Sequence, residues 1–392
     1  MLNAKQEDKI KKIVVCGSTG SIGRQTLEVC DWFPERVQVI GLTGGSNIEL
    51  LAQQVKKFKP RAVALADEAK YAEFKSMLGN TETEILVGES GVAEVAALPQ
   101  ADLQVAAISG LAGLRPTLCG IEAGLDIAFA NKEVLVAAGE LVMQKVRKGG
   151  AGFFPVDSEH SAIWQCLDGR AEPQGLILTC SGGPFKHAEA AEIAAAGPEQ
   201  TLKHPTWQMG AKISVDSATL RNKGLEIIEA HWLFDIPYQR ITAVIHPESI
   251  IHSMVQYADG SLLAQMSYPD MRLPIQFALF YPQRLPNELK PLDFPAVASL
   301  SFWQPDEERF PCLRLAKEAG MAGGTAPAVL SGANEVLVHA FLQGKIRLGD
   351  IYNGTAAVLQ DYHNTAAESL SAITAADAWA RRAAADWLAH KQ

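Results

Sequence analysis

The sequence predicts an α/β protein, in which a doubly wound parallel sheet is followed by a central α+β domain and a C-terminal helical bundle. Three observations support this fold class. From residue 13 to about residue 155, short apolar runs alternate with amphipathic stretches, as in parallel strands covered by helices on both faces. After about residue 156, strand-like segments with turn signals take over. From residue 312 onward, Ala-rich segments carry leucines at helical spacing.

The length fits two or three domains, because the chain has 392 residues and a domain takes roughly 100 to 200. We place a first domain at 1–155 and a central one at 156–281. Six prolines between Pro282 and Pro311 predict an extended linker at 282–311, and Pro327 after Thr325 predicts a helix start within the helical domain at 312–392.

Composition excludes several classes of protein. The formal charge of −9 opposes a broad nucleic-acid-binding surface. The chain has no apolar run long enough for a membrane span, and its N-terminus is charged, so we expect a soluble cytoplasmic protein without a signal peptide. The six cysteines form no CxxC pair, which argues against a zinc site or a disulfide framework.

The first strand, near residues 13–16, runs into the glycine-rich segment Gly17–Gly23 and then a helix. Glycines in this position allow a tight turn and bring backbone N–H groups close to a pyrophosphate, so the segment is a candidate dinucleotide loop. Its spacing is GxxGxxG, and the alternative is a turn that only packs the helix on the sheet.

The second strand is predicted to end near Leu42 and is followed by Thr43–Asn47, which contains no carboxylate. NAD-preferring sites place an acidic residue here on the ribose 2′-hydroxyl, so its absence favours NADP. Arg24 is a candidate helper. The alternative is that Gly44 and Gly45 only shape a turn.

Two further strands end in polar residues. The strand at 126–130 leads into Asn131–Glu133, and the one at 152–156 leads into Asp157–His160. Open α/β sheets bind ligands at this edge. If Asp157 and Glu159 belong to an extended segment, their carboxylates project to one side and favour Mg²⁺ or Mn²⁺, although a solvated surface pair is the alternative.

Three later segments complete the candidates. Residues 179–184 follow a strand and form a candidate anion nest around Ser181, and 204–210 have the composition of a mobile lid or, alternatively, of core packing. Residues 212–220 are strand-like. Asp216–Glu229 is predicted as a helix interrupted or begun near Gly224, with Ser217, Asn222 and Lys223 as candidate phosphate ligands or as part of a solvated face.

Taken together, GSTGSIG, NKE, DSEHSA, SGGPF, IHPESIIHSMV and the long HPTWQMGAKISVDSATLRNKGLEIIEAHWLF stretch resemble the 1-deoxy-D-xylulose 5-phosphate reductoisomerase family of the methylerythritol phosphate route to isoprenoids. These motifs run in family order from residue 13 to about residue 280. The resemblance implies a Rossmann-like NADPH domain, a catalytic domain and a helical tail, usually in a homodimer.

The resemblance also implies roles for individual residues. The metal ligands for Mg²⁺, Mn²⁺ or Co²⁺ are Asp157, Glu159 and Glu226. Lys132, Glu159 and His160 are the candidate catalytic residues, with the role of His160 open. The NADPH contacts are Thr19, Gly20, Ser21, Ile22, Gly45, Ser46, Asn47, Asn131, Glu133 and Gly210. The substrate contacts are Lys132, Ser158, Glu159, Ser181, His204, Trp207, Met209, Ser217, Asn222, Lys223 and Glu226.

One departure from the family concerns the cofactor. Many relatives carry a basic residue where this chain has Ser46, so the resemblance leaves open how a 2′-phosphate is held.

The implied reaction is a metal-assisted rearrangement of 1-deoxy-D-xylulose 5-phosphate followed by NADPH-dependent reduction to 2-C-methyl-D-erythritol 4-phosphate. The order of binding, the physiological metal and the type of rearrangement, retro-aldol or direct shift, stay open. Two rival functions are a metal-independent NADP dehydrogenase with a nucleophilic cysteine and a non-catalytic NADPH sensor.

Overall fold

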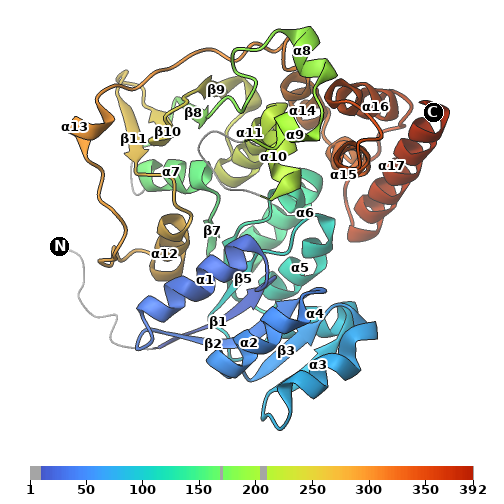
Figure 1. The fold of residues 1–392 in the computed structure, drawn as a ribbon. Coiled ribbons are helices and arrows are strands. Elements are labelled where there is room, and N and C mark those ends of the chain that lie inside the picture. Colours follow the sequence, from blue (N-terminus) through green and yellow to red (C-terminus); the bar gives the residue numbers. More distant parts are fainter. Residues whose placement is uncertain (1–9, 168–170, 204–209, 392) are drawn as a thin grey trace. The chain divides into compact units, whose positions relative to one another are not determined.

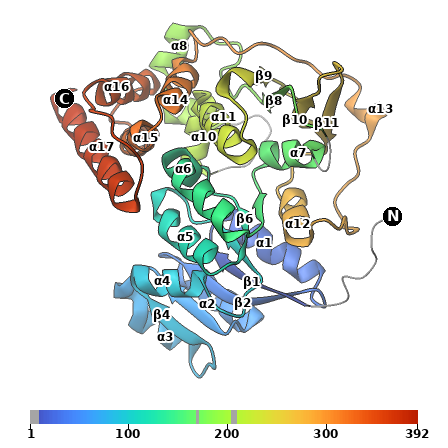
Figure 2. The same cartoon turned by 180° about the vertical axis from the view of Figure 1, so that it is seen from behind.

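The computed structural model describes residues 10–167, 171–203 and 210–391, which fall into two compact units (Figures 1 and 2). Unit 1 contains the chain up to residue 131 together with 144–157 and 270–289, and unit 2 contains 132–143, 158–269 and the chain from residue 290. The functional division at 155, 281 and 311 stays a prediction, since unit 2 takes residues from every one of the four predicted segments.

A seven-stranded sheet forms the centre of unit 1, and every neighbouring pair of strands is parallel. The strand order is β4-β3-β2-β1-β5-β6-β7. Most of these strands are apolar and buried because helices cover both faces, which confirms the predicted doubly wound fold. The strands are β1 (Lys11–Cys16), β2 (Val37–Gly44), β3 (Ala62–Leu65), β4 (Glu84–Val87), β5 (Leu103–Ala106), β6 (Asp126–Phe129) and β7 (Phe153–Pro155).

The order of the strands reverses between β1 and β5, the point at which open sheets of this type bind ligands. The helices that follow β1 to β3 lie on one face of the sheet, and α4 and α5 pack together on the other (Figures 1 and 2). The helices of unit 1 are α1 (Ser21–Trp32), α2 (Ile48–Phe58), η1 (Glu68–Lys70), α3 (Tyr71–Leu78), α4 (Gly88–Ala96), η2 (Leu111–Gly113), α5 (Leu114–Glu122) and α12 (Arg272–Phe280), which packs on α1.

A four-stranded mixed sheet, ordered β11-β10-β8-β9, lies in unit 2. Strands β8 (Gly175–Cys180) and β9 (Ile241–Ile245) are parallel, whereas β10 (Ile251–Gln256) runs antiparallel to both β8 and β11 (Leu262–Met266). Residues 258–260, Ala-Asp-Gly, are one of the turn signals after residue 156, and they join β10 to β11 in an antiparallel hairpin. Helix α7 (Ser158–Leu167) packs against this hairpin.

The expectation that residues 212–220 are strand-like is wrong, because α10 (Ala211–Ala218) is a helix. Alternation of Ile213 and Val215 with polar residues suggested a strand, but the polar residues bond along a helix. The Ser214 hydroxyl donates to the carbonyl oxygen of Gly210, and Lys212 pairs with Asp216 one turn later.

The predicted break near Gly224 is also misplaced. Helix α11 (Arg221–Phe234) begins after Leu220, whose left-handed φ of 54° separates it from α10. Gly224 lies inside α11 because a neighbouring helix comes close: a Cβ there would be 2.4 Å from the Cβ of Ala316. A helix interior tolerates glycine when packing requires it.

The C-terminal helices of unit 2 confirm the predicted bundle, and α15 contacts each of the other three. They are α14 (Pro311–Ala322), α15 (Ala326–Leu342), α16 (Leu348–Gln360) and α17 (Leu370–Lys391). Pro327 stands in the first turn of α15, as predicted. Within the described residues, the regular structure of the Pro-rich segment before α14 is the short helix α13 (Phe294–Val297) and a bridge between Trp303 and Ile245.

No helix in the described part of the chain has both the length and the apolar character needed to cross a membrane.

Candidate functional site

The glycine loop lies where the sequence predicts it, between β1 and α1. Gly17 has a φ of +83°, and a Cβ there would lie 2.6 Å from the carbonyl oxygen of Ala107 after β5. A Cβ at Gly23 would lie 2.3 Å from the carbonyl oxygen of Gly17. Gly20 is the N-cap residue of α1, and since it has no side chain, no side-chain hydrogen bond caps the helix. A close-packed backbone at a helix N-terminus fits a pyrophosphate, and the predicted contacts Thr19, Gly20, Ser21 and Ile22 all belong to this loop or to the first turn of α1.

The end of β2 continues into the exposed residues Gly45, Ser46 and Asn47. Asn47 caps α2, because its Oδ1 accepts a hydrogen bond of 3.1 Å from the N–H of Leu50. Residues 44–47 carry neither an acidic nor a basic side chain. The absence of an acidic side chain fits NADPH better than NADH.

Asn131 joins two loops of unit 1. Its buried side-chain amide donates to the carbonyl oxygens of Ile108 and Gly110, the latter at 2.9 Å. The end of β6 is thereby bonded to the segment after β5, at the edge of the sheet that holds the glycine loop.

A cluster of two carboxylates and two lysines lies in unit 2. The Nζ of Lys223 is 2.9 Å from Oε1 of Glu159 and also donates to Oε2 of Glu226. From the start of α6 (Lys132–Gly149), Lys132 donates to Oε1 of Glu226 at 3.0 Å and to Oδ1 of Asn222 at 2.8 Å. The cluster is almost dry, because the side chains of Lys223 and Glu226 are 3% and 1% exposed.

The carboxylates of this cluster suit a divalent cation. Glu159 and Glu226 belong to a group whose ligand oxygens lie within 4.8 Å of one another. The third member of that group is Asp157, whose backbone is joined to Ser158, the first residue of α7. Such an all-oxygen set fits Mg²⁺ or Mn²⁺.

The predicted extended geometry of Asp157–Glu159 is wrong, because Ser158 already begins a helix. The spacing of two residues along a strand therefore does not align the carboxylates. Glu159 reaches Lys223 from the first turn of α7 instead, and the Ser158 hydroxyl donates to Oε2 of Glu159 at 2.5 Å.

Lys223 stays charged in this environment. Burial by itself lowers the pKa of an ammonium group, but Glu159 and Glu226 more than offset that effect and raise the pKa of Lys223 above its ordinary value. One cation already stands between the two carboxylates, which shows that they are close enough to share a positive charge.

His160 contacts the backbone of the helix turn that carries Glu226. Its Nε2 bonds the backbone carbonyl oxygen of Glu226 at 2.9 Å, and its Nδ1 is 3.5 Å from Oε2 of Glu229. Both side chains are fully buried. These contacts fit a residue that positions the turn of α11 carrying Glu226.

The predicted phosphate ligands converge on the junction between α10 and α11. The loop after β8 turns through Gly182 and Gly183, which both have positive φ, and the hydroxyl of Ser181 accepts from the N–H of Gly183 at 3.2 Å. A Cβ at Gly183 would lie 3.1 Å from the carbonyl oxygen of Ser217. The loop thus packs on the end of α10, while Asn222 and Lys223 stand in the first turn of α11.

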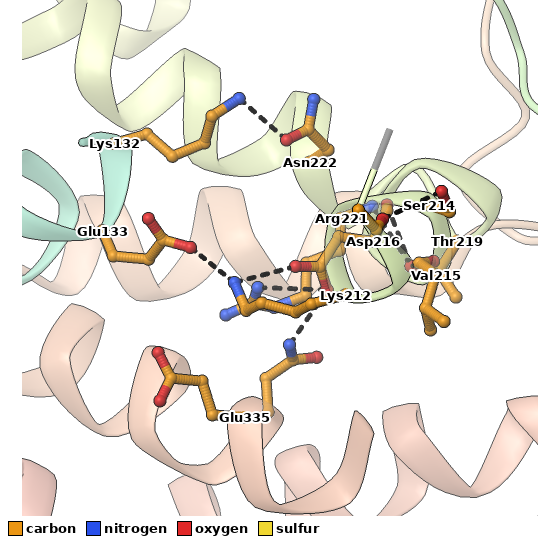
Figure 3. Close-up of polar contacts among 12 residues, drawn as sticks. Lys132, Glu133, Lys212, Ser214, Val215, Asp216, Thr219, Arg221, Asn222 and Glu335 are labelled. Carbon is orange, nitrogen blue, oxygen red and sulfur yellow. Dashed lines mark hydrogen bonds and ion pairs between the residues drawn. The ribbon is translucent and has the colours of Figure 1, made fainter. Parts of the chain in front are cut away.

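A chain of alternating charges connects α6 to this junction, and its central residue, Lys212, is not among the site residues predicted from the sequence (Figure 3). Lys212 pairs with Oε1 of Glu133 and, at 3.1 Å, with Oδ2 of Asp216. Oδ1 of Asp216 is 3.4 Å from Nη1 of Arg221 and accepts from Asn334 on α15 at 2.9 Å. The spacing of four residues between Lys212 and Asp216 is the signal that could have identified the pair.

The charges in this chain are mutually stabilised. Burial opposes ionisation of Asp216, but Lys212 and Arg221 lower the pKa of its carboxyl below the usual value. Burial likewise opposes ionisation of Glu133, and Lys212 reverses that effect and lowers the pKa. The start of α6 and the α10–α11 junction are therefore connected by ionised groups.

His204, Trp207 and Met209 lie outside the described residues. Gly210, the predicted cofactor contact that follows them, is exposed and caps α10.

The cysteines do not support a thiol nucleophile. Burial raises the pKa of Cys16 and Cys312 to about 12 and that of Cys180 to about 11. Burial raises the thiol pKa of Cys30 and Cys119 as well. A nucleophilic cysteine needs a lowered pKa, so these thiols weigh against a cysteine-dependent dehydrogenase.

Comparison with known families gives the same answer over three stretches of the chain. The model of 1-deoxy-D-xylulose 5-phosphate reductoisomerase matches residues 13–139, and models of the C-terminal domains of that enzyme match 153–234 and 266–383. The chain belongs to the 1-deoxy-D-xylulose 5-phosphate reductoisomerase family. The resemblance inferred from the motifs is thus confirmed, and so is the predicted class of enzyme.

Curated relatives in this reductoisomerase family match almost end to end. The protein of that name from Chlorobaculum tepidum is 52% identical over 377 residues, which cover 96% of this chain and 99% of the relative. The one from Pelotomaculum thermopropionicum is 50% identical over 375 residues, covering 95% and 97%.

Solved structures of reductoisomerases have the same fold. The Zymomonas mobilis enzyme in complex with NADPH matches with a TM-score of 0.91 and 42% identity, covering 97% of this chain and 99% of that one. A reductoisomerase in complex with NADPH, fosmidomycin and magnesium matches with a TM-score of 0.92 and 39% identity, covering 97% and 98%. NADPH and magnesium, both among the predicted cofactors, are therefore bound in structural neighbours.

Proposed function

We propose that this chain converts 1-deoxy-D-xylulose 5-phosphate into 2-C-methyl-D-erythritol 4-phosphate, with NADPH as reductant and Mg²⁺ or Mn²⁺ as the divalent cation. The observation that carries the proposal is the buried cluster in which Glu159 and Glu226 share the charge of Lys223. Family membership and neighbours solved with NADPH and magnesium support the same reaction.

Asp157, Glu159 and Glu226 would hold the cation. When bound, it would act as a Lewis acid on the keto and hydroxyl oxygens of the substrate. Glu226 is held in place by Lys132, Asn222 and Lys223 and by the backbone contact to His160. The carboxylate of Glu226 is therefore oriented before a cation binds, which lowers the cost of ordering this ligand on binding.

Lys132 is the candidate for proton transfer and charge stabilisation at the reacting oxygens. Its ammonium has three donors, and the Asn222 amide and the Glu226 carboxylate orient two of them. Ser158 and Glu159, at the N-terminus of α7, are the candidates for contact with the substrate hydroxyls. The skeleton is rearranged to an aldehyde, and hydride from NADPH with one proton then gives the alcohol.

Ser181, Ser217, Asn222 and Lys223 would bind the phosphate, with His204 as a further predicted contact. The phosphate is remote from the reacting carbons, so its binding energy can hold the substrate in the reactive orientation. Trp207 and Met209 are proposed to belong to a loop that closes over the substrate and excludes water.

Most of the proposed cofactor contacts lie in unit 1, at the loop from Gly17 to Gly23 and the end of β2. Both places lie at the carboxyl edge of the parallel sheet, because Gly17 follows β1 and Gly45 follows β2, its neighbour in the sheet. Asn131, Glu133 and Gly210 are the remaining proposed contacts.

We further propose a cytoplasmic homodimer. Several large apolar side chains in the described part of unit 2 are exposed, among them Leu262 on the edge strand β11 and Phe294, Phe302 and Trp303 in the Pro-rich segment. An unpaired edge strand and exposed apolar side chains are both surfaces that a second copy could cover.

The test of the function follows NADPH absorbance with chelator-treated protein and 1-deoxy-D-xylulose 5-phosphate, with Mg²⁺ or Mn²⁺ added midway. We expect oxidation to begin only when the metal is added. Equal rates before and after the addition would remove the metal from the mechanism. Absence of oxidation with folded protein and either metal would contradict the proposed reaction and favour a nucleotide sensor.

A further inference from the structure

The ammonium of Lys70 lies at the end of β2, where a dinucleotide's adenosine ribose is recognised in sheets of this type. Its Nζ donates to the backbone carbonyl oxygen of Ser46 at 2.8 Å. Lys70 ends η1, which follows β3, and β3 pairs in parallel with β2 so that Leu65 lies beside Gly44. The two loops therefore leave neighbouring strands at the same edge of the sheet.

The segment after β2 lacks a cation of its own. A 2′-phosphate carries a double negative charge near neutral pH, and sites that accept it supply a basic group near the end of the second strand. Residues 44–47 offer a hydroxyl, an amide and backbone donors but no basic side chain. Lys70 brings an ammonium to that segment from the next loop along the sheet.

Lys70 is available for an anion. In the described part of the chain it forms no ion pair within 4.0 Å, and its hydrogen bond to Ser46 uses one of its three donors. The neighbouring Asp67 is engaged in capping η1, where its Oδ1 accepts from the N–H of Ala69 at 3.2 Å. The carbonyl bond holds the lysine over an exposed serine without neutralising its charge.

We propose that Lys70 determines the preference for NADPH over NADH by binding the 2′-phosphate beside Ser46. The inference rests on the proposed use of NADPH, and it assigns the cation for this phosphate to a residue of η1.

The test measures the dissociation constants of NADPH and NADH by nucleotide fluorescence, without substrate or metal. Lys70→Met should weaken NADPH binding by about tenfold and leave NADH binding unchanged, because only NADPH carries the phosphate. Lys75→Met, on the next helix, is the matched control and should change neither constant. Added salt should reduce the NADPH preference of the unaltered protein more than that of the variant, because it screens an exposed charge pair.

Two further variants test the position of the charge. Lys70→Arg should retain the preference, and Ser46→Lys combined with Lys70→Met should restore it, because a lysine at 46 returns an ammonium to the same place. The assignment would be overturned if Lys70→Met lost affinity for NADPH and NADH equally, or if its affinity for NADPH were unchanged. If the unaltered protein binds NADPH but does not turn over the substrate, the proposed function fails while this test still decides the role of Lys70. Absence of NADPH binding would overturn both.

Discussion

Lys223 and Glu226 form a deeply buried ion pair in the candidate site, and each has several partners. Lys223 contacts Glu159 as well as Glu226, and Glu226 also accepts from Lys132 and Asn222. A change at either residue therefore leaves a buried charge without full compensation. Such changes cost more than the loss of an exposed pair.

Glu226→Gln should lower turnover by about 100-fold or more, because it removes one anionic metal ligand without removing bulk. The dissociation constant of Mn²⁺, measured by electron paramagnetic resonance, should rise, and excess metal should partly restore activity. Glu307→Gln, which alters an ion pair with Lys317 on α14, is the control and should behave like the unaltered protein. Unchanged Mn²⁺ affinity in Glu226→Gln would contradict its role as a ligand.

His252 predicts how stability depends on pH. Burial lowers the pKa of this histidine on β10 from 6.5 to about 4. The folded state therefore keeps it neutral at a pH where the unfolded chain binds a proton. The free energy of unfolding should fall by about 3 kcal/mol as the pH drops from 6.5 to 4, and this contribution should be fully present above 6.5. The urea midpoint of unfolding should change less with pH across this range in His252→Gln than in the unaltered protein. An equal change with pH in both proteins would assign the effect to other groups.

At the scale of elements, the start of α6, the end of α10 and the start of α11 are fixed to one another by two routes. One is the direct contact of Lys132 with Asn222 and Glu226. The other runs through Glu133, Lys212, Asp216 and Arg221 (Figure 3). The charge chain through Lys212 thus holds together the same helices, α6 and α11, that the direct contact of Lys132 joins.

Lys212→Met should destabilise the protein by about 2 kcal/mol, because it leaves the largely buried Glu133 without its partner and Asp216 with one cation fewer. It should also lower turnover, since the start of α6, which carries Lys132, loses the ion pair of Glu133 with Lys212. Lys317→Met is a matched control, because its side chain is equally exposed, at 31%. Thermal unfolding and turnover that match this control would show that the charge chain contributes nothing, and Lys212→Arg should restore most of both.

Gly224→Ala should destabilise the protein although alanine is the better helix former. A Cβ at this position would lie 2.4 Å from the Cβ of Ala316, so α11 and α14 must move apart. We expect a loss of about 1 to 3 kcal/mol in chemical unfolding. In Gly149→Ala, a Cβ would meet only an ordinary contact of 3.6 Å, so this control at the end of α6 should be neutral or stabilising. A stabilised Gly224→Ala would disprove the packing argument.

At the scale of the whole molecule, most of the residues proposed for the cofactor lie in unit 1, and most of those proposed for the cation and the substrate lie in unit 2. The glycine loop and the end of β2 lie in unit 1, whereas Glu159, Glu226 and the phosphate ligands lie in unit 2. Each ligand should therefore stabilise most strongly the unit that holds most of its contacts, because binding to the folded state opposes local opening.

Hydrogen exchange with NADPH alone should slow mainly at residues 17–23 and 44–48, and exchange with Mg²⁺ alone should slow mainly near the N-termini of α7 and α11. Glu226→Gln should abolish the second effect and leave the first intact. Protection by Mg²⁺ confined to unit 1 would contradict the location of the metal site.

The local order of the chain was readable from the sequence wherever local chemistry decides it. Apolar runs identified the buried parallel strands, glycines at 17 and 23 identified the loop after β1, and the polar ends of β6 and β7 identified one side of the site. These features follow from the period of a strand and the freedom of glycine, which depend on near neighbours in the chain.

The tertiary structure decided what lies opposite each of these residues. The sequence predicts a strand-like segment at 212–220, yet 211–218 is a helix whose Lys212 and Asp216 also bond partners on α6 and α15, and α14 explains the glycine at 224. The sharing of Lys223 by Glu159 and Glu226 joins residues 67 positions apart in the chain, and the reach of Lys70 to Ser46 spans two strands. Contacts of this kind depend on packing between distant segments, which periodicity within one segment does not encode.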